Sequence, residues 1–440
     1  MIKLIITTLL TSTLITSYSF AEKLEKPLQI RFIRVYGESN ESNPPILLLQ
    51  NQQSTQSPIG YNFITIEFDI LADVPPALYA KFYHCSADWN EDENVFLNDI
   101  ITSRTSNIYW NSAPITETYY SYRGTITIPN SQVKFEFAGN WKIKIFHYDN
   151  DTSPLAEARF FIVKPIAKCN LKIYSDFYDP DYNFISPTSI TAEAYVYADS
   201  KMFDSQQNTC VLYKNHRWYE PIYISKDDNL SQLNNKFRYH YQTMIGGFLN
   251  AGKLFRIAGI PAENEYRVLD LSNLTAYPNV NVIVSTPLPD LRRRGEFWEK
   301  DNDGAMSSQF IADYNNNYVN MEFRLRPDNW ITPDEIFIAG SFNNWKPTAE
   351  WQMYYDKNSG YYKLRQLIPR AKHDYMYATG RLNISTGEVE KISYDQFEGN
   401  ASNHDNTYII FVYYREFDYG GYDSIIAVSA ANFFGTLKRY

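Results

Sequence analysis

The chain of 440 residues contains only three cysteines, Cys85, Cys169 and Cys210. They lie far apart and never adopt a CxxC spacing, and at least one must be free or pair outside the chain. Cys169 and Cys210 can form a disulfide in an oxidising compartment, but we interpret each cysteine as an inert buried thiol. The stability of the fold must therefore come from packed sheets.

Motifs of common enzymes are missing as well. The sequence contains no GxSxG elbow, no glycine-rich phosphate loop and no HExxH. No histidine lies two or four residues from another histidine or from a cysteine, so the sequence gives no support for a zinc site. His84 adjoins Cys85, but neighbouring residues on a strand point to opposite faces and cannot form a dyad. We therefore predict a protein that is not an enzyme, with no catalytic residue, cofactor or metal.

The chain has few charged residues and no sustained run of basic ones. Charged residues make up 21% of the chain, and the formal net charge is -9. This balance argues against nucleic acid and against anionic lipid surfaces as partners. The short run Arg292–Arg294 is interpreted as a solvated linker, and Asp301–Gly304 as a solvated turn, because the calcium loop that it resembles is incomplete.

Long apolar stretches are confined to the N-terminus. Residues Leu4–Phe20 carry no charge and follow Lys3, and Ser19–Ala21 places small residues before a charged start at Glu22. This arrangement is typical of a cleavable signal peptide at 1–21. A retained anchor is the alternative, although serines and threonines make the stretch a poor spanning helix. The mature protein is thus expected to be exported.

Aromatic residues are abundant. The chain has 37 Tyr, 27 Phe and 8 Trp, which together make 16% of residues. Tyrosine and phenylalanine favour strands and bury large areas. No convincing amphipathic helix longer than three turns is present, so a sheet with crossover helices is not indicated. We predict an all-β chain built from consecutive immunoglobulin-like and early-set β-sandwich domains.

Turn residues divide the chain into units. We predict an N-terminal immunoglobulin-like sandwich at 22–165, a middle sandwich at 166–288, a linker at 289–304, a C-terminal early-set sandwich at 305–428, and a tail at 429–440. The period-two segment Tyr318–Leu325 and the strand Ile409–Tyr414 are both assigned to the third unit.

A strand and turn at Glu335–Trp345 present a large ring at a loop. Gly340 breaks the strand, and Ser341, Phe342, Asn343, Asn344 and Trp345 follow. The segment resembles early-set modules that accompany starch- and glycogen-acting enzymes. That resemblance implies a role for Trp345 in sugar stacking, but Met376 stands where the lysine of that pattern falls, and the loop Gly380–Asn383 lacks its second tryptophan. We therefore interpret the turn as structural.

Four further segments together resemble a known family. They are the loop His84–Asn90 with Asp88 and Trp89, the strand Gly139–Phe146, the strand Arg159–Val163, and the final Phe411–Phe417 with Tyr422 and Asp423. In order and spacing they are similar to the type IX secretion system plug proteins of Bacteroidetes. The resemblance covers about residues 27–428. The polar loop Leu382–His404 departs from the family pattern.

The resemblance implies a periplasmic protein that binds and occludes the outer-membrane translocon barrel of the type IX system. Its partner would be that barrel, approached from the periplasmic side, with no nucleic acid and no small-molecule substrate. Candidate binding or structural residues are Asp88, Trp89, Phe342, Asn343, Asn344 and Trp345. A periplasmic carbohydrate-binding protein acting through the early-set module is the alternative. A periplasmic scaffold with another partner also remains open, because fold does not determine function.

Overall fold

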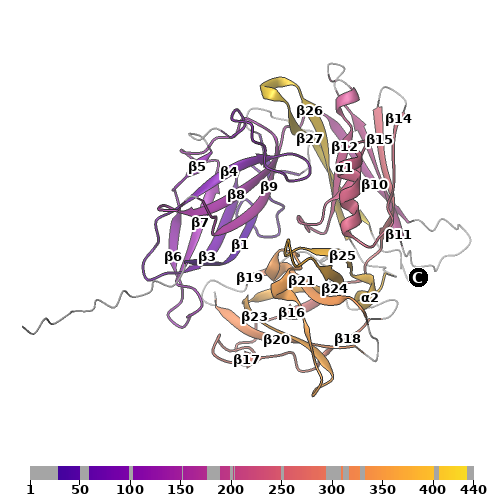
Figure 1. Cartoon of the computed structure of the whole chain (residues 1–440). Helices are drawn as coiled ribbons and strands as arrows, with labels where there is room; N and C mark the ends of the chain where they lie inside the picture. The colour runs from indigo at the N-terminus through magenta and orange to yellow at the C-terminus, as the bar shows by residue number, and fades with distance from the viewer. Residues whose placement is uncertain are drawn as a thin grey trace, which may run out of the picture.

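The computed structural model of the chain is built from β-strands (Figure 1). It describes residues 28–49, 59–98, 103–150, 152–175, 189–198, 202, 204–248, 252–293, 309–310, 317–327, 332–400 and 406–433. The predicted all-β class is confirmed. No helix in these residues is long and apolar enough to span a membrane. The predicted signal peptide at 1–21 and the turn Asp301–Gly304 lie outside the described residues.

The first sandwich encloses a core between two sheets. One sheet has the order β1 (Gln29–Gly37), β3 (Ile64–Leu71), β7 (Tyr122–Ile128) and β6 (Tyr109–Ser112). The facing strands are β9 (Ala156–Val163), β8 (Gly139–His147), β4 (Leu78–Cys85) and β5 (Arg104–Thr105), and β2 (Ile46–Leu48) pairs with β9. Ile64, Ile66 and Phe68 alternate along β3 into this core, where they meet Phe82 and Trp141. The period-two pattern thus places every second side chain inside.

The second sandwich is built the same way. One sheet has the order β10 (Lys168–Ser175), β11 (Ser189–Tyr197), β15 (Gly252–Pro261) and β14 (Gln242–Phe248). The facing strands are β13 (Ile222–Ser225), β12 (Thr209–Lys214), β26 (Asn406–Glu416) and β27 (Tyr422–Phe433). Short helices η1 (Asp204–Gln206), α1 (Asp228–Leu233) and η2 (Asn234–Lys236) complete it. Asp227 caps α1 by accepting a hydrogen bond from the backbone N–H of Asn229.

The third sandwich lies at the bottom of Figure 1. In one sheet β24 (Ala371–Leu382) pairs with β16 (Arg267–Asp270), β19 (Gln309–Phe310), β21 (Glu335–Gly340) and β25 (Val389–Ser393). In the other, β20 (Tyr318–Arg326) pairs with β17 (Ile283–Val284), β18 (Asp290–Leu291) and β23 (Tyr361–Pro369), and β23 pairs with β22 (Tyr354–Asp356). The short helices are η4 (Ser341–Asn343), η5 (Ala349–Trp351) and α2 (Asp395–Glu398). The residues Val319, Met321 and Phe323 fill the core between the sheets.

The hairpin β26–β27 joins the first two sandwiches, and η6 (Asp418–Gly420) forms its tip. β26 pairs with β12, where Val412 lies opposite Cys210, and Ile425 of β27 pairs with Val163 of β9. The assignment of Ile409–Tyr414 to the third unit is therefore wrong, although the strand itself is present. The predicted tail from 429 is also wrong at its start, since β27 continues to Phe433. Alternation identifies a strand but not its partner.

The expected linker is partly a structured element. β18 pairs with β20, and Arg293 is buried, with its Nη1 3.7 Å from Oε2 of Glu398. The backbone N–H of Arg293 donates to the carbonyl of Phe397 at 2.8 Å. The interpretation of this arginine as solvated is thus wrong, because its charge is paired inside the protein. The boundaries of the predicted units near 165 and 288 stay predictions.

Candidate functional site

The loop after β4 carries Trp89 into the interior. Trp89 is only 3% exposed and has a φ of 69°, a left-handed conformation that a bulky residue adopts at a cost. Its Nε1 donates to the hydroxyl of Tyr213 in the second sandwich at 2.9 Å, and its ring meets Phe161 edge to face. Trp89 therefore connects two sandwiches. It is not available as an exposed binding ring.

The same loop is fastened by the C-terminal hairpin. Asn140, fully buried on β8, donates from Nδ2 to the carbonyls of Ser86 at 3.0 Å and Ala87 at 3.3 Å. Its Oδ1 accepts a hydrogen bond from the hydroxyl of Tyr413 at 2.7 Å. The carboxylate of Asp423 accepts from the backbone N–H of Ala87 at 3.0 Å. One buried amide thus couples the loop to β26.

Asp88 supports the loop from within. Its Oδ1 accepts from the hydroxyl of Ser86 at 2.5 Å and from the backbone N–H of Asn90 at 3.0 Å. Such local hydrogen bonds are the usual reason for aspartate in a tight turn. The structure therefore gives Asp88 a structural role in shaping the turn that delivers Trp89.

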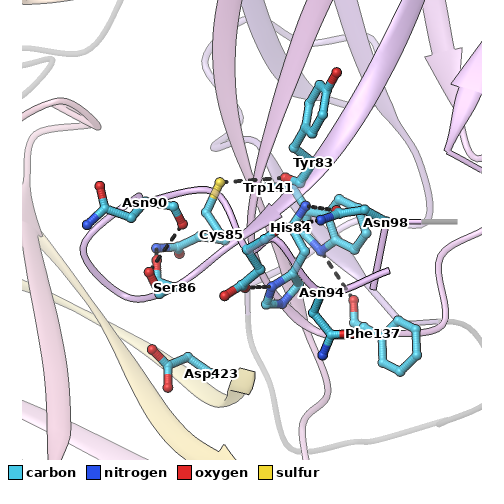
Figure 2. A network of polar contacts seen from close by, with 12 residues as sticks. Tyr83, His84, Cys85, Ser86, Asn90, Asn94, Asn98, Phe137, Trp141 and Asp423 are labelled. Carbon is cyan, nitrogen blue, oxygen red and sulfur yellow. Dashed lines mark hydrogen bonds and ion pairs between the residues drawn. The ribbon is translucent and has the colours of Figure 1, made fainter. Parts of the chain in front are cut away.

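Figure 2 shows that His84 and Cys85 point away from each other. His84 is buried, with Nδ1 2.5 Å from Oδ2 of Asp92 and Nε2 3.1 Å from the carbonyl oxygen of Ala138. The thiol of Cys85 lies 3.6 Å from the carbonyl of Tyr83, and burial raises its pKa to about 12. A thiolate is the reactive form of cysteine, so this thiol is unreactive at neutral pH. Cys169 and Cys210 are also free thiols here.

A column of alternating aromatic and cationic groups spans all three sandwiches. The guanidinium carbon of Arg159, on β9, lies 4.5 Å from the ring centre of Trp89 and 4.5 Å from that of Tyr219. On Tyr219, Nζ of Lys346 from the third sandwich lies 5.2 Å from the ring centre. Burial lowers the pKa of Lys346, and the charge of Arg159 adds to the effect. We call Trp89, Arg159, Tyr219 and Lys346 the three-sandwich junction.

The turn that follows β21 contributes to this junction. Trp345, with a φ of 58°, is 4% exposed, and its ring lies 4.9 Å from that of Tyr266. Asn344 reaches the first sandwich, where its Nδ2 donates to the carbonyl of Ile33 at 3.0 Å. Stacking on a sugar needs an exposed aromatic face, which Trp345 does not offer. The geometry therefore supports the structural interpretation of this turn.

The first half of the turn is held by its own hydrogen bonds. The side chain of Asn343 accepts from the backbone N–H of Gly340 at 2.8 Å and donates to the carbonyl of Ile338 at 2.9 Å. The ring of Phe342 is buried and stacks on Trp351 with 4.9 Å between ring centres. The side chain of Asn343 thus makes hydrogen bonds that form the turn, and the ring of Phe342 fills the core.

A buried ion cluster couples the second and third sandwiches, and sequence reasoning missed it. Nζ of Lys214 lies 3.1 Å from Glu263, while Arg217 contacts both Glu263 at 2.9 Å and Glu220 at 3.1 Å. The hydroxyl of Tyr394 donates to Glu220. No local spacing reveals the cluster, because Glu263 joins it from a distant strand end. That these charged side chains form one cluster could be found only from the fold.

The pKa values of these buried groups are shifted. Burial lowers the pKa of Lys214 to about 8, although Glu263 opposes this shift. Burial alone would raise the pKa of Glu263, but Arg217 and Lys214 together lower it to about 2. The cations and carboxylates pair with one another, so the cluster serves as a structural joint. Among the described residues no group of three or more histidine, cysteine or acidic side chains could hold a metal ion.

Comparisons with known proteins agree with this architecture. Residues 30–164 match the model for the first domain of type 9 secretion system plug proteins. The fold is similar to that of a hypothetical protein from Parabacteroides merdae ATCC 43184, with a TM-score of 0.69 and 19% identity. That likeness covers 92% of this chain and 97% of the other, and at this identity it shows the fold alone. No curated protein matches the chain.

Proposed function

Because the chain belongs to the type IX secretion system plug family through residues 30–164, we propose that it binds and occludes the outer-membrane translocon barrel. It acts in the periplasm, after export by a cleavable signal peptide, and its partner is the barrel protein. It makes and breaks no bond, and it takes no nucleic acid or small-molecule substrate. The match of residues 30–164 is the observation that carries this proposal.

The way the sandwiches are joined supports it. A body that stops a pore must keep its shape while cargo and barrel press on it. Here a shared sheet connects the first two sandwiches, the buried ion cluster couples the second to the third, and the three-sandwich junction touches all of them. Closely packed interiors of this kind have low compressibility. The chain therefore suits a stopper whose parts do not move independently.

Conductance measurements test this function directly. The purified barrel protein of the type IX system is reconstituted in a planar bilayer, and the plug is added on the periplasmic side. We expect the ionic current to fall as the plug concentration rises and to recover when the plug is washed out. Heat-denatured plug at equal concentration is the control. An unchanged current at plug concentrations that saturate binding to the barrel would refute occlusion.

The carbohydrate-binding alternative lacks a matching observation. It depends on an exposed ring at Trp345, which is buried against Tyr266. Affinity electrophoresis in a gel containing soluble starch should show no retardation of the wild-type protein. Retardation that disappears in Trp345→Ala would instead restore the alternative.

A further inference from the structure

Exposed apolar side chains gather at the tip of the β26–β27 hairpin. Phe417 and Tyr419 of this tip are 63% and 55% exposed, and Val95 and Phe96 of the neighbouring loop are 74% and 63% exposed. The rings of Phe96 and Tyr419 lie 6.4 Å apart. We call these four residues the aromatic tip. Other highly exposed apolar residues, such as Ile115 and Ile384, lie singly on separate loops, which is ordinary for a protein surface.

The aromatic tip is held in a defined arrangement. The side chain of Asn94 donates a hydrogen bond to the carbonyl of Tyr419. Phe137 contacts Tyr419 edge to face, with 5.1 Å between ring centres, and Tyr422 in the same way at 5.4 Å. Tyr419 has a φ of 53°, a conformation that costs a bulky residue free energy. The folded protein thus holds Tyr419 in an unfavourable backbone conformation although its ring is largely exposed to water.

Acidic residues adjoin the aromatic tip along the chain. The two loops that form its rim carry Glu93, Glu416 and Asp418. Of the nearby basic residues, Arg415 is paired with Asp423 at 3.1 Å. Burial raises the pKa of Glu416, and the positive charge of Lys164 opposes that shift. An apolar centre with a polar, charged rim is the usual anatomy of a protein–protein contact. Anionic phospholipid headgroups would be repelled by the same acids. The charge of the rim therefore favours a protein partner over a membrane surface.

We propose that the aromatic tip docks into an apolar socket, rimmed by basic residues, on the translocon barrel. This inference rests on the proposed function, because it names the surface with which the plug would hold its partner. Phe96, Phe417 and Tyr419 act as anchors, since aromatic side chains supply large contact areas with few rotatable bonds. The acids steer the encounter and set its orientation.

Binding of purified plug to the purified barrel protein in detergent tests the anchors. The double variant Phe96→Ser/Phe417→Ser should raise the Kd about tenfold or more, as loss of interface anchors does. Its melting temperature should match the wild type, because both rings are already exposed. The matched control is Tyr354→Ala/Tyr355→Ala on β22, which removes two half-exposed rings from the third sandwich and should bind as the wild type does.

The outcomes separate the two proposals. Tight binding by the wild type with unchanged binding by the double variant would overturn the docking surface and leave the plug function intact. No binding of the wild type to the barrel would overturn both. A selective loss in the double variant supports the aromatic tip.

Charge and lipid provide an independent check. Asp418→Lys should slow association with the barrel at low salt, and the difference should shrink as salt is added. Vesicles of phosphatidylethanolamine and phosphatidylglycerol should not bind the wild type. Vesicle binding that the double variant loses would show that the aromatic tip serves a membrane, and would overturn the protein socket.

Discussion

The buried histidine beside the turn of β21 makes the protein sensitive to acid in a calculable way. His373 is 1% exposed, its Nε2 lies 2.6 Å from the carbonyl oxygen of Pro369, and its Nδ1 lies 3.0 Å from the hydroxyl of Ser341. The carbonyl can only accept, so Nε2 carries the proton and Nδ1 accepts from Ser341. Burial lowers the pKa of His373 to about 4, and the charge of Arg34 contributes. The neutral ring is therefore the native form.

The sign of the effect follows from proton binding. An unfolded histidine titrates near ~6.5, so between ~6.5 and ~4 the unfolded chain binds more protons than the folded one. Stability contributed by the neutral ring is present above that range and is lost as pH falls through it. At a pH of about 5 the loss amounts to about 2 kcal/mol relative to neutral pH. This corresponds to roughly 4–8 °C in melting temperature for a unit of this size.

Thermal unfolding of wild type and His373→Gln at about pH 7.5 and about pH 5 tests this reasoning. Glutamine retains a donor and an acceptor but cannot titrate. We expect the variant to be less stable at neutral pH and to lose less on acidification than the wild type, by about 2 kcal/mol. Other titrating groups affect both proteins equally and cancel in the difference. Equal acid sensitivity of the two proteins would refute the assignment to His373.

Three further expectations concern the joints and the tyrosines. Asn140→Ala strands the hydroxyl of Tyr413 and two carbonyls, so it should cost about 3 kcal/mol in urea unfolding; a loss below about 1 kcal/mol would contradict the buried network. Gly139→Ala should lower the melting temperature markedly, because φ is 146° and a Cβ would lie 2.3 Å from Nε2 of His84; an unchanged value would show that the backbone relaxes freely. The free energy of unfolding should fall above pH ~10, because buried tyrosines keep their protons while those of the unfolded chain lose them. In a pH titration, tyrosinate absorbance should rise in one cooperative step together with unfolding, and a gradual rise before unfolding would contradict this. Burial raises the pKa well above its usual value in buried tyrosines such as Tyr266, Tyr318 and Tyr377.

Local patterns predicted much of the fold. Tyr318–Leu325 alternates and forms β20, and Trp141–Phe146 lies within β8. The aromatic content also predicted the all-β class, because aromatic side chains lie in the cores of the first and third sandwiches and in the layer between the first two. What local patterns could not predict is which strand pairs with which. β26 buries Ile410 on one face and Phe411 on the other, and this marks a central strand without naming its neighbours.

Sequence analysis selected Trp89 and Trp345 as possible binding residues, but in the structure both rings are buried. Trp89 and Trp345 stand out in the sequence because large rings at turns are unusual, and sequence alone cannot show whether such a ring faces water. Here each fills the space between sandwiches. The ion cluster of Lys214, Arg217 and Glu263 has no sequence signature, because burial of a charge depends on contacts made by distant segments. The aromatic tip likewise depends on two loops that meet only after folding.

The place of β26–β27 has a consequence for how this chain acquires its native state. This hairpin follows all the other described strands along the chain, yet β12 and β9, which lie roughly two hundred or more residues before it, gain it as a neighbour. Contacts of such high sequence separation slow folding. Until this hairpin pairs with them, β12 and β9 each leave an open sheet edge, and exposed edges promote pairing with other chains. Helper proteins that shield such edges would therefore matter most in the interval before the final hairpin closes the gap.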